Sequence, residues 1–182
     1  MSLAVLALAL AVQAQAQANP APRVVSPNFL PMEIRKAVDE ANNLCKESGG
    51  NPGKSSKLIT FVDLTGDGVI DFVMDLNNYQ CEGAASALSA GQSGSALTIF
   101  VGGPNNTAKE AYHALVQAPK VITVESLKRL YVGVMGADCG QKNAAKKALA
   151  DLEVCMRPLN WTADKQVFVL GPLNEKRAFV IQ

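Results

Sequence analysis

The stretch LITFVDLTGDGVIDFVMDLN (residues 58–77) decides the fold, because it places a glycine-containing loop between two apolar runs. Residues 58–62 are β-branched and aromatic, which is typical of a buried strand. Residues 72–77 continue as a second strand after the loop. The loop DLTGDGVID (63–71) therefore connects two strands, and the stretch predicts a β-hairpin.

The loop 63–71 carries oxygen-bearing side chains at alternate positions, and Gly68 relieves the crowding of a tight coil. Alternate positions from the first to the ninth supply the ligands of a calcium loop. The sequence predicts a Ca²⁺ site formed by four side chains, with Asp71 acting directly or through water, and one main-chain carbonyl: Asp63, Thr65, Asp67 and Asp71, with the carbonyl of Val69. Without a cation these aspartates would repel one another. We expect weak, structural binding, with a Kd on the order of 10⁻⁴–10⁻³ M.

A metal-free turn is the alternative for this loop. Asp63 and Asp67 would then accept hydrogen bonds from backbone N–H groups, and Gly68 would adopt the left-handed conformation. The loop also differs from a helix-loop-helix calcium site, because Met74 stands at the twelfth position, where a bidentate Glu is normal.

The loop resembles the D-x-[DNT]-x-D-G-x-x-D loops of FG-GAP/VCBS-type and EF-hand-like calcium proteins. More broadly, residues 63–83 and the later Cys-Gly segment are similar to a group of uncharacterised exported bacterial proteins, in which a strand, a D-G-D-type loop, a strand and a cysteine recur in order. The resemblance implies a calcium loop in an exported protein. Thr65 departs from the usual Asp or Asn of that pattern.

A helix is predicted over residues 31–48, where apolar residues recur at helical spacing: Ile34, Ala37, Val38, Ala41, Leu44 and Cys45. Pro31 suits the first turn, and Gly49 and Gly50 supply the stop. The apolar stripe predicts that this helix packs on the sheet. The fold class expected is α+β, with an antiparallel sheet.

The rest of the chain predicts further strands with one more helix. Residues 82–96 are rich in Gly, Ser and Ala and predict a surface loop. Residues 142–154 have helical spacing of apolar residues, although their charges oppose the helix dipole. The expected strands are 97–102, 111–117, 121–125, 127–136, 156–161, 166–171 and 177–182.

Four cysteines form an even set, which predicts disulfides in an exported chain: Cys45, Cys81, Cys139 and Cys155. Three connectivities are possible. We favour Cys45–Cys81 and Cys139–Cys155, because each closes a local loop worth about 3–4 kcal/mol of denatured-chain entropy. Zinc is disfavoured, since the chain has no C-x-x-C pair and a single histidine.

The beginning of the chain predicts export. Residues 1–18 contain an apolar run without charges, followed by A-x-A cleavage options, as in a signal peptide. A leading Lys or Arg is missing, and an apolar helix that stays attached is the alternative. Residues 19–30 are expected to form a flexible leader and residues 31–182 a single α+β domain. The expected location is the periplasm or the exterior, with no membrane contact after cleavage.

Composition gives no electrostatic reason to expect a nucleic-acid partner, because 17 basic and 16 acidic residues leave a net charge of +1. The leading functional hypothesis is a non-enzymatic binding or structural module that takes an unidentified protein or cell-envelope ligand. A periplasmic hydrolase and an inhibitor of a secreted enzyme are the alternatives.

The hydrolase would use His113, the single histidine, beside a serine, with Asp75 or Glu110 as its orienting carboxylate. No G-x-S-x-G or H-E-x-x-H motif supports it. Trp161, the single tryptophan, is expected in a hairpin core or at an edge, with a carbohydrate platform as the alternative.

Overall fold

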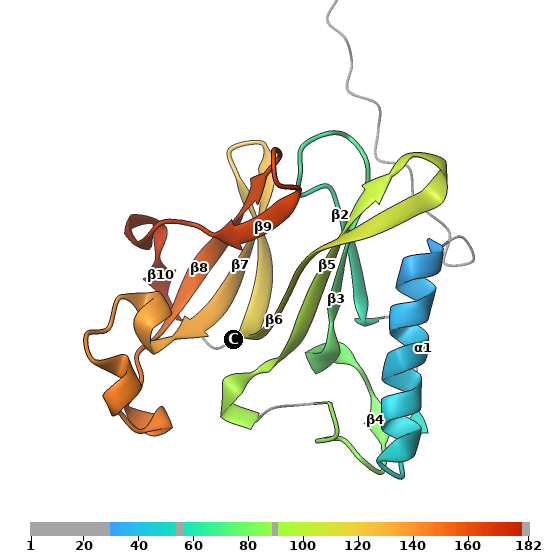
Figure 1. The fold of residues 1–182 in the computed structure, drawn as a ribbon, viewed down its shortest axis with the longest axis horizontal. Helices are drawn as coiled ribbons and strands as arrows, with labels where there is room; N and C mark the ends of the chain where they lie inside the picture. The colour runs from blue at the N-terminus through green and yellow to red at the C-terminus, as the bar shows by residue number, and fades with distance from the viewer. Residues whose placement is uncertain (1–29, 54–56, 89–90, 180–182) are drawn as a thin grey trace, which may run out of the picture.

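The computed structural model describes residues 30–53, 57–88 and 91–179. Within these residues it contains one α-helix, α1 (Met32–Glu47), and a set of β-strands joined by turns and short 3₁₀ segments (Figure 1). The expected signal peptide and, apart from Leu30, the expected leader lie outside the described residues. The strands are β1 (Asn51–Pro52), β2 (Ile59–Val62), β3 (Asp71–Asp75), β4 (Cys81–Glu82), β5 (Ser95–Gly103), β6 (Thr107–Val124), β7 (Leu127–Met135), β8 (Val154–Thr162), β9 (Val167–Leu170) and β10 (Arg177–Ala178).

The main sheet is antiparallel, in the order β10-β8-β7-β6-β5-β3-β2, and β9 pairs with the far part of β8. β2 and β3 form the predicted hairpin around residues 63–71. The sheet curls, as Figure 1 shows. Lys109 Nζ in β6 donates a 2.9 Å hydrogen bond to Gln166 Oε1 in the β8–β9 turn. The mixed helix-and-sheet class and the antiparallel sheet are therefore as predicted.

Buried side chains form two clusters on opposite faces of β3. Val73 belongs to the first cluster, which also takes alternate residues of β5 and β7. Phe72 and Met74 belong to the second cluster, together with Ile34 and Ala41 of α1. This division follows from the strand period of two, which sends neighbouring side chains to opposite faces.

All four cysteines of the chain are paired, in the predicted connectivity. The bonds are Cys45–Cys81, between α1 and β4, and Cys139–Cys155, between a short 3₁₀ turn and β8. Within the described ranges, none of the helices combines the length and the apolar character that a membrane crossing demands.

The helix predicted over residues 142–154 is wrong. The segment forms two short 3₁₀ turns, Ala144–Lys146 and Leu149–Asp151. Asn143 has a left-handed backbone, with φ of 57°, and Ala148 is extended, so helical hydrogen bonding cannot run through. The Gln141 side chain instead donates to the carbonyl of Asp151 and accepts from the N–H of Glu153. Because the charges of this segment oppose the helix dipole, a helix here would be weakly stabilised, and the local hydrogen bonds of Gln141 are formed instead.

Two other predictions are refined. The predicted strands 111–117 and 121–125 are parts of one strand, β6, which ends at Val124 and whose register shifts between Gln117 and Lys120. Pro119 lies at this irregularity, which is where a sheet tolerates proline. In the predicted loop 82–96, β5 already begins at Ser95.

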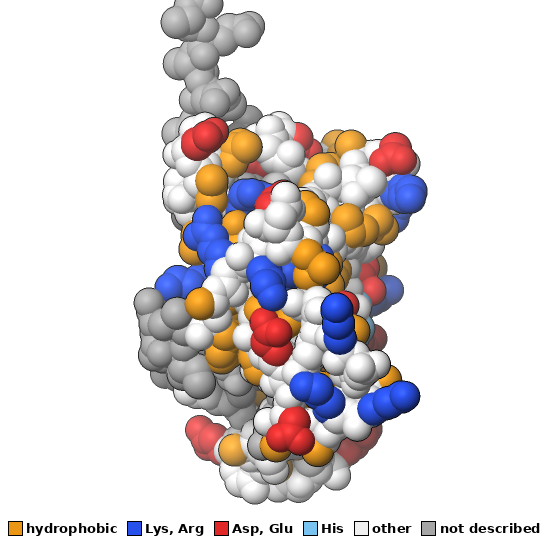
Figure 2. All heavy atoms as spheres, turned by 90° about the vertical axis from the view of Figure 1, so that its left-hand side faces the viewer, with side chains coloured by type: hydrophobic (Ala, Val, Ile, Leu, Met, Phe, Trp, Pro, Cys, Tyr) orange, Lys and Arg blue, Asp and Glu red, His pale blue; other side chains and the backbone are white. Residues whose placement is uncertain are grey.

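Basic and acidic side chains lie interspersed on the face of the molecule shown in Figure 2.

Candidate functional site: a cleft beside the loop 63–71

The loop 63–71 is folded by hydrogen bonds from its own backbone to its carboxylates. Asp63 Oδ1 accepts from the N–H of Gly66 at 2.7 Å, and Asp63 Oδ2 accepts from the N–H of Gly68 at 2.9 Å. Both glycines have positive φ angles, of 78° and 83°, which L side chains rarely adopt. The glycines therefore allow the coil that brings these N–H groups to one carboxylate.

Asp71 ends the loop and is fully buried. Its Oδ2 accepts hydrogen bonds from the N–H groups of Leu64 and Thr65, at 2.8 and 3.1 Å, and its Oδ1 accepts one from Gly102 in β5. Burial raises the pKa of Asp71 to about 6, although these three N–H donors act in the opposite direction. Asp71 thus anchors the loop to the neighbouring strand.

The remaining loop oxygens have the chemistry that suits Ca²⁺, but their arrangement is only partly convergent. Thr65 Oγ1 lies 3.4 Å from Asp63 Oδ1, whereas Asp67 Oδ1 accepts from the N–H of Val69 at 2.8 Å. In the part of the chain that the structure describes, no group of three or more His, Cys, Asp or Glu side chains is placed to hold a metal. Each carboxylate oxygen has two lone pairs, so Asp63 and Asp67 keep acceptor capacity beyond these bonds.

A cleft of about 460 Å³ lies between the start of the loop, the β6–β7 turn and the end of β8. Figure 1 shows the three segments at the same end of the curled sheet. Asp63, Leu64, Thr65 and Gly66 form the wall from the loop. The side chains that face them across the cleft include charged, amide and aromatic groups: Lys128, Arg129, Asn160 and Trp161.

Two of these groups are held by their neighbours. Arg129 Nη2 donates to Asn160 Oδ1 at 2.7 Å and to Glu175 Oε2 at 2.6 Å, and the second contact is a partly exposed ion pair. The Trp161 ring is half-buried, packs against the first cluster and lies 5.1 Å from the Phe168 ring. Trp161 therefore has the core role expected of it and also lines the cleft.

The groups proposed for a hydrolase are not brought together. His113 is exposed on β6, and its Nδ1 lies 2.9 Å from Thr98 Oγ1. Asp75 is buried elsewhere, and its carboxylate accepts hydrogen bonds from Asn77, Asn78 and Ser95. Burial raises the pKa of Asp75. Within the described ranges His113 has neither Asp75 nor Glu110 as a hydrogen-bond partner.

Sequence reasoning identified the loop but missed Lys128, Arg129 and Asn160. These residues form no motif, and they line the same cleft as Asp63 although they are far from it in the sequence. Their proximity follows from the pairing of β6, β7 and β8, which a single sequence does not reveal. No family model matches the chain, and comparisons with curated proteins and with solved structures give no match.

Proposed function

We propose that the protein is an exported, non-enzymatic binding module that holds a sugar-like ligand of the cell envelope in the cleft beside the loop 63–71. The observation that carries this proposal is the composition of the cleft. It combines the aromatic ring of Trp161 with a carboxylate, an amide and a guanidinium, from Asp63, Asn160 and Arg129. An aromatic face suits the C–H face of a sugar ring, while the polar groups suit its hydroxyls.

The position of the cleft supports the same proposal. Ligand sites often lie in the mouths of curled β-structures, where the sheet supplies a rigid frame. Here the ion pair of Arg129 with Glu175 and the ring contact of Trp161 with Phe168 hold two of the binding groups before a ligand arrives. A preorganised site loses less conformational entropy on binding.

Export to the periplasm or the exterior is part of the proposal. The two disulfides support it, because paired thiols persist in oxidising compartments. The packing of α1 on the sheet is also part of it. Ile34 and Ala41 share a buried cluster with Phe72, and Cys45–Cys81 ties α1 to the chain beyond β3.

Calcium enters the proposal as a structural ion. Asp63, Thr65 and Asp67 would hold it through side-chain oxygens, with the Val69 carbonyl, while Asp71 would position the loop through its N–H bonds. Bound calcium would neutralise the acidic wall of the cleft. It would also hold that wall in place for the ligand.

Trp161 makes the test direct, because it is the single tryptophan of the chain and lines the cleft. We expect oligomers of N-acetylglucosamine, used as a soluble probe of cell-envelope sugars, to change its fluorescence in a saturable manner. Asn160→Ala should weaken this binding about tenfold, since it removes one polar contact and one of the two groups that hold Arg129. Asn43→Ala, an exposed asparagine of α1, is the matched control.

The proposal is abandoned if saturating oligosaccharide leaves the fluorescence unchanged, or if Asn43→Ala weakens binding as much as Asn160→Ala does. Cleavage of the oligosaccharide that disappears in His113→Ala would favour the hydrolase instead.

A further inference from the structure

A second cavity, of about 540 Å³, lies on the outer face of the sheet, away from the cleft. Strand register places its residues on one face. Lys120 pairs with Tyr131 across β6 and β7, and Met156 pairs with Arg177 across β8 and β10. Leu130 and Val132, the neighbours of Tyr131, belong instead to the first cluster on the inner face.

This half of the outer face has no cover from the second cluster. That cluster includes no residue of β7, β8 or β10. Tyr131 and Met156 are nevertheless buried, with 4% and 9% of their surfaces exposed, and belong to neither cluster. The floor of the cavity therefore includes buried, largely apolar side chains.

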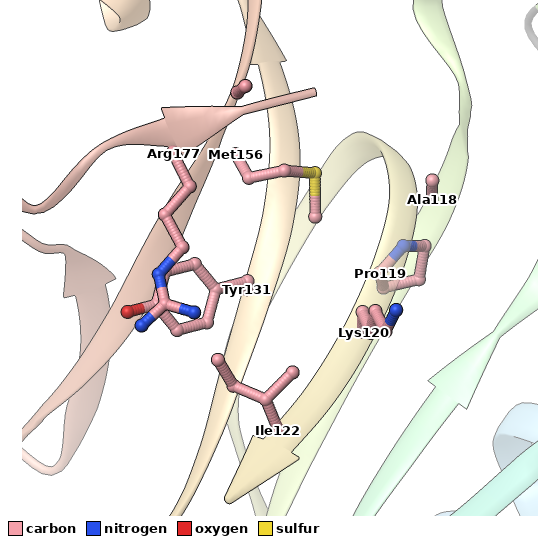
Figure 3. A pocket seen from close by; sticks show the side chains of 8 residues that line it. Ala118, Pro119, Lys120, Ile122, Tyr131, Met156 and Arg177 are labelled. Carbon is pink, nitrogen blue, oxygen red and sulfur yellow. The ribbon is translucent and has the colours of Figure 1, made fainter. Parts of the chain in front are cut away.

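The rim of the cavity is positively charged. Figure 3 shows the Arg177 guanidinium over the Tyr131 ring on one side and Lys120 on the other, with Ile122 between them. The Arg177 guanidinium carbon lies 4.6 Å from the centre of the Tyr131 ring. Neither Lys120 nor Arg177 forms an ion pair with any described carboxylate, and no acidic residue is among the described residues that line the cavity.

Stacking on Tyr131 leaves the N–H edge of the Arg177 guanidinium available to an anion. A guanidinium in that position binds a carboxylate through two parallel hydrogen bonds, and a lysine across the cavity adds a second positive charge. The volume lies within the roughly 300–1,000 Å³ typical of small-molecule sites. The ligand that fits is one with an anionic head and an apolar body.

We propose that this cavity binds a free anionic amphiphile, of the class of medium-chain fatty acids. The carboxylate lies between Arg177 and Lys120, and the alkyl chain lies against Tyr131, Met156 and Ile122. This site is separate from the sugar-binding cleft, and neither proposal depends on the other.

Calorimetric titration with sodium octanoate tests the proposal, with octan-1-ol and acetate as comparators. We expect octanoate to bind at least about tenfold more tightly than either, because only octanoate supplies both the charge and the apolar body. The double variant Lys120→Met with Arg177→Met keeps apolar bulk and should lose about tenfold in affinity. The double variant Lys142→Met with Lys165→Met removes two exposed lysines elsewhere and should bind normally.

Nuclear magnetic resonance of ¹³C-methyl-labelled methionine locates the ligand. Octanoate should shift the methyl signal of Met156 and leave those of Met32 and Met74 unchanged. Equal affinity for octan-1-ol, an unmoved Met156 signal or equal loss in both double variants overturns the proposal. Binding to phosphatidylglycerol vesicles without binding to octanoate also overturns it, in favour of general attraction to an anionic surface. If the double variant does not fold, Ile122→Asp, which puts a negative charge into the cavity, replaces it.

Discussion

The buried carboxylate of Asp71 accepts a 3.1 Å hydrogen bond from the backbone N–H of Gly102. This bond joins the end of the loop 63–71 to β5, so the loop is fixed from outside its own hairpin. Gly102 has no room for a side chain. A Cβ atom there would lie 2.1 Å from the carbonyl oxygen of Ile70.

Gly102→Ala should therefore displace the loop from β5. We expect a loss of about 3 kcal/mol in the free energy of unfolding, because the clash is with backbone atoms that cannot rotate away. Gly103→Ala is the control, since its Cβ would meet the Thr107 hydroxyl at 2.8 Å, and that side chain can turn. Urea denaturation compares the two variants. Equal stability would mean that the loop tolerates movement at β5.

The raised pKa of Asp71 gives a defined dependence of stability on pH. Its pKa is about 6 in the folded protein and about 3.9 in an unfolded chain. Between these values the folded state binds the proton more tightly. The free energy of unfolding therefore falls as the pH rises from 4 to 6, by about 3 kcal/mol from this group. The stabilisation is complete below pH 4 and lost above pH 6.

Denaturation curves between pH 4 and 7 measure this effect. The decrease in the free energy of unfolding with rising pH that comes from Asp71 should disappear in Asp71→Asn. It should remain in Asp151→Asn, which changes an exposed carboxylate. If the three N–H donors outweigh burial, the sign reverses. The folded pKa then lies below 3.9, and Asp71 stabilises the protein increasingly as the pH rises.

Calcium should raise the stability of the protein if the loop holds it. At a concentration 100 times the Kd, a ligand of the folded state adds about 2.7 kcal/mol to the free energy of unfolding. Thermal unfolding with and without excess Ca²⁺ measures this gain. Asp67→Asn should reduce it, whereas Asp39→Asn, on the exposed face of α1, should not. Identical melting curves with and without Ca²⁺ would assign the loop to the metal-free turn.

The two disulfides should contribute unequally to stability. Cys45–Cys81 closes a separation of 36 residues and Cys139–Cys155 one of 16. Loop entropy then gives about 4 kcal/mol for the first and about 3 kcal/mol for the second. Replacing each pair by alanines and measuring urea denaturation should show the larger loss for the first pair. The reverse order would show that native packing near Cys139 outweighs chain entropy.

Local patterns predicted much of the fold. The helix over residues 31–48 matches α1 closely, because its apolar stripe, Pro31 and Gly49 all indicate the same element. Cysteine spacing gave the correct pairing. The helix predicted over residues 142–154 failed because its apolar spacing conflicted with its charges, and a left-handed Asn143 with the Gln141 side-chain bonds decided the structure.

The candidate site was predictable only where it is local. The sequence located the oxygens of Asp63 and Asp67 and the turn at Gly68. The burial of Asp71 depends on β5, and the cleft depends on β7 and β8, so both follow from long-range pairing. No spacing along the chain relates Asp63 to Asn160.

β6 has 18 residues, and its first part pairs with β5 while its second part pairs with β7. Because both halves of the sheet are hydrogen-bonded to this one strand, neither half can detach without breaking its ladder to β6. Unfolding should then proceed as one cooperative step, and the backbone amides near Val116 should be among the slowest to exchange with deuterium.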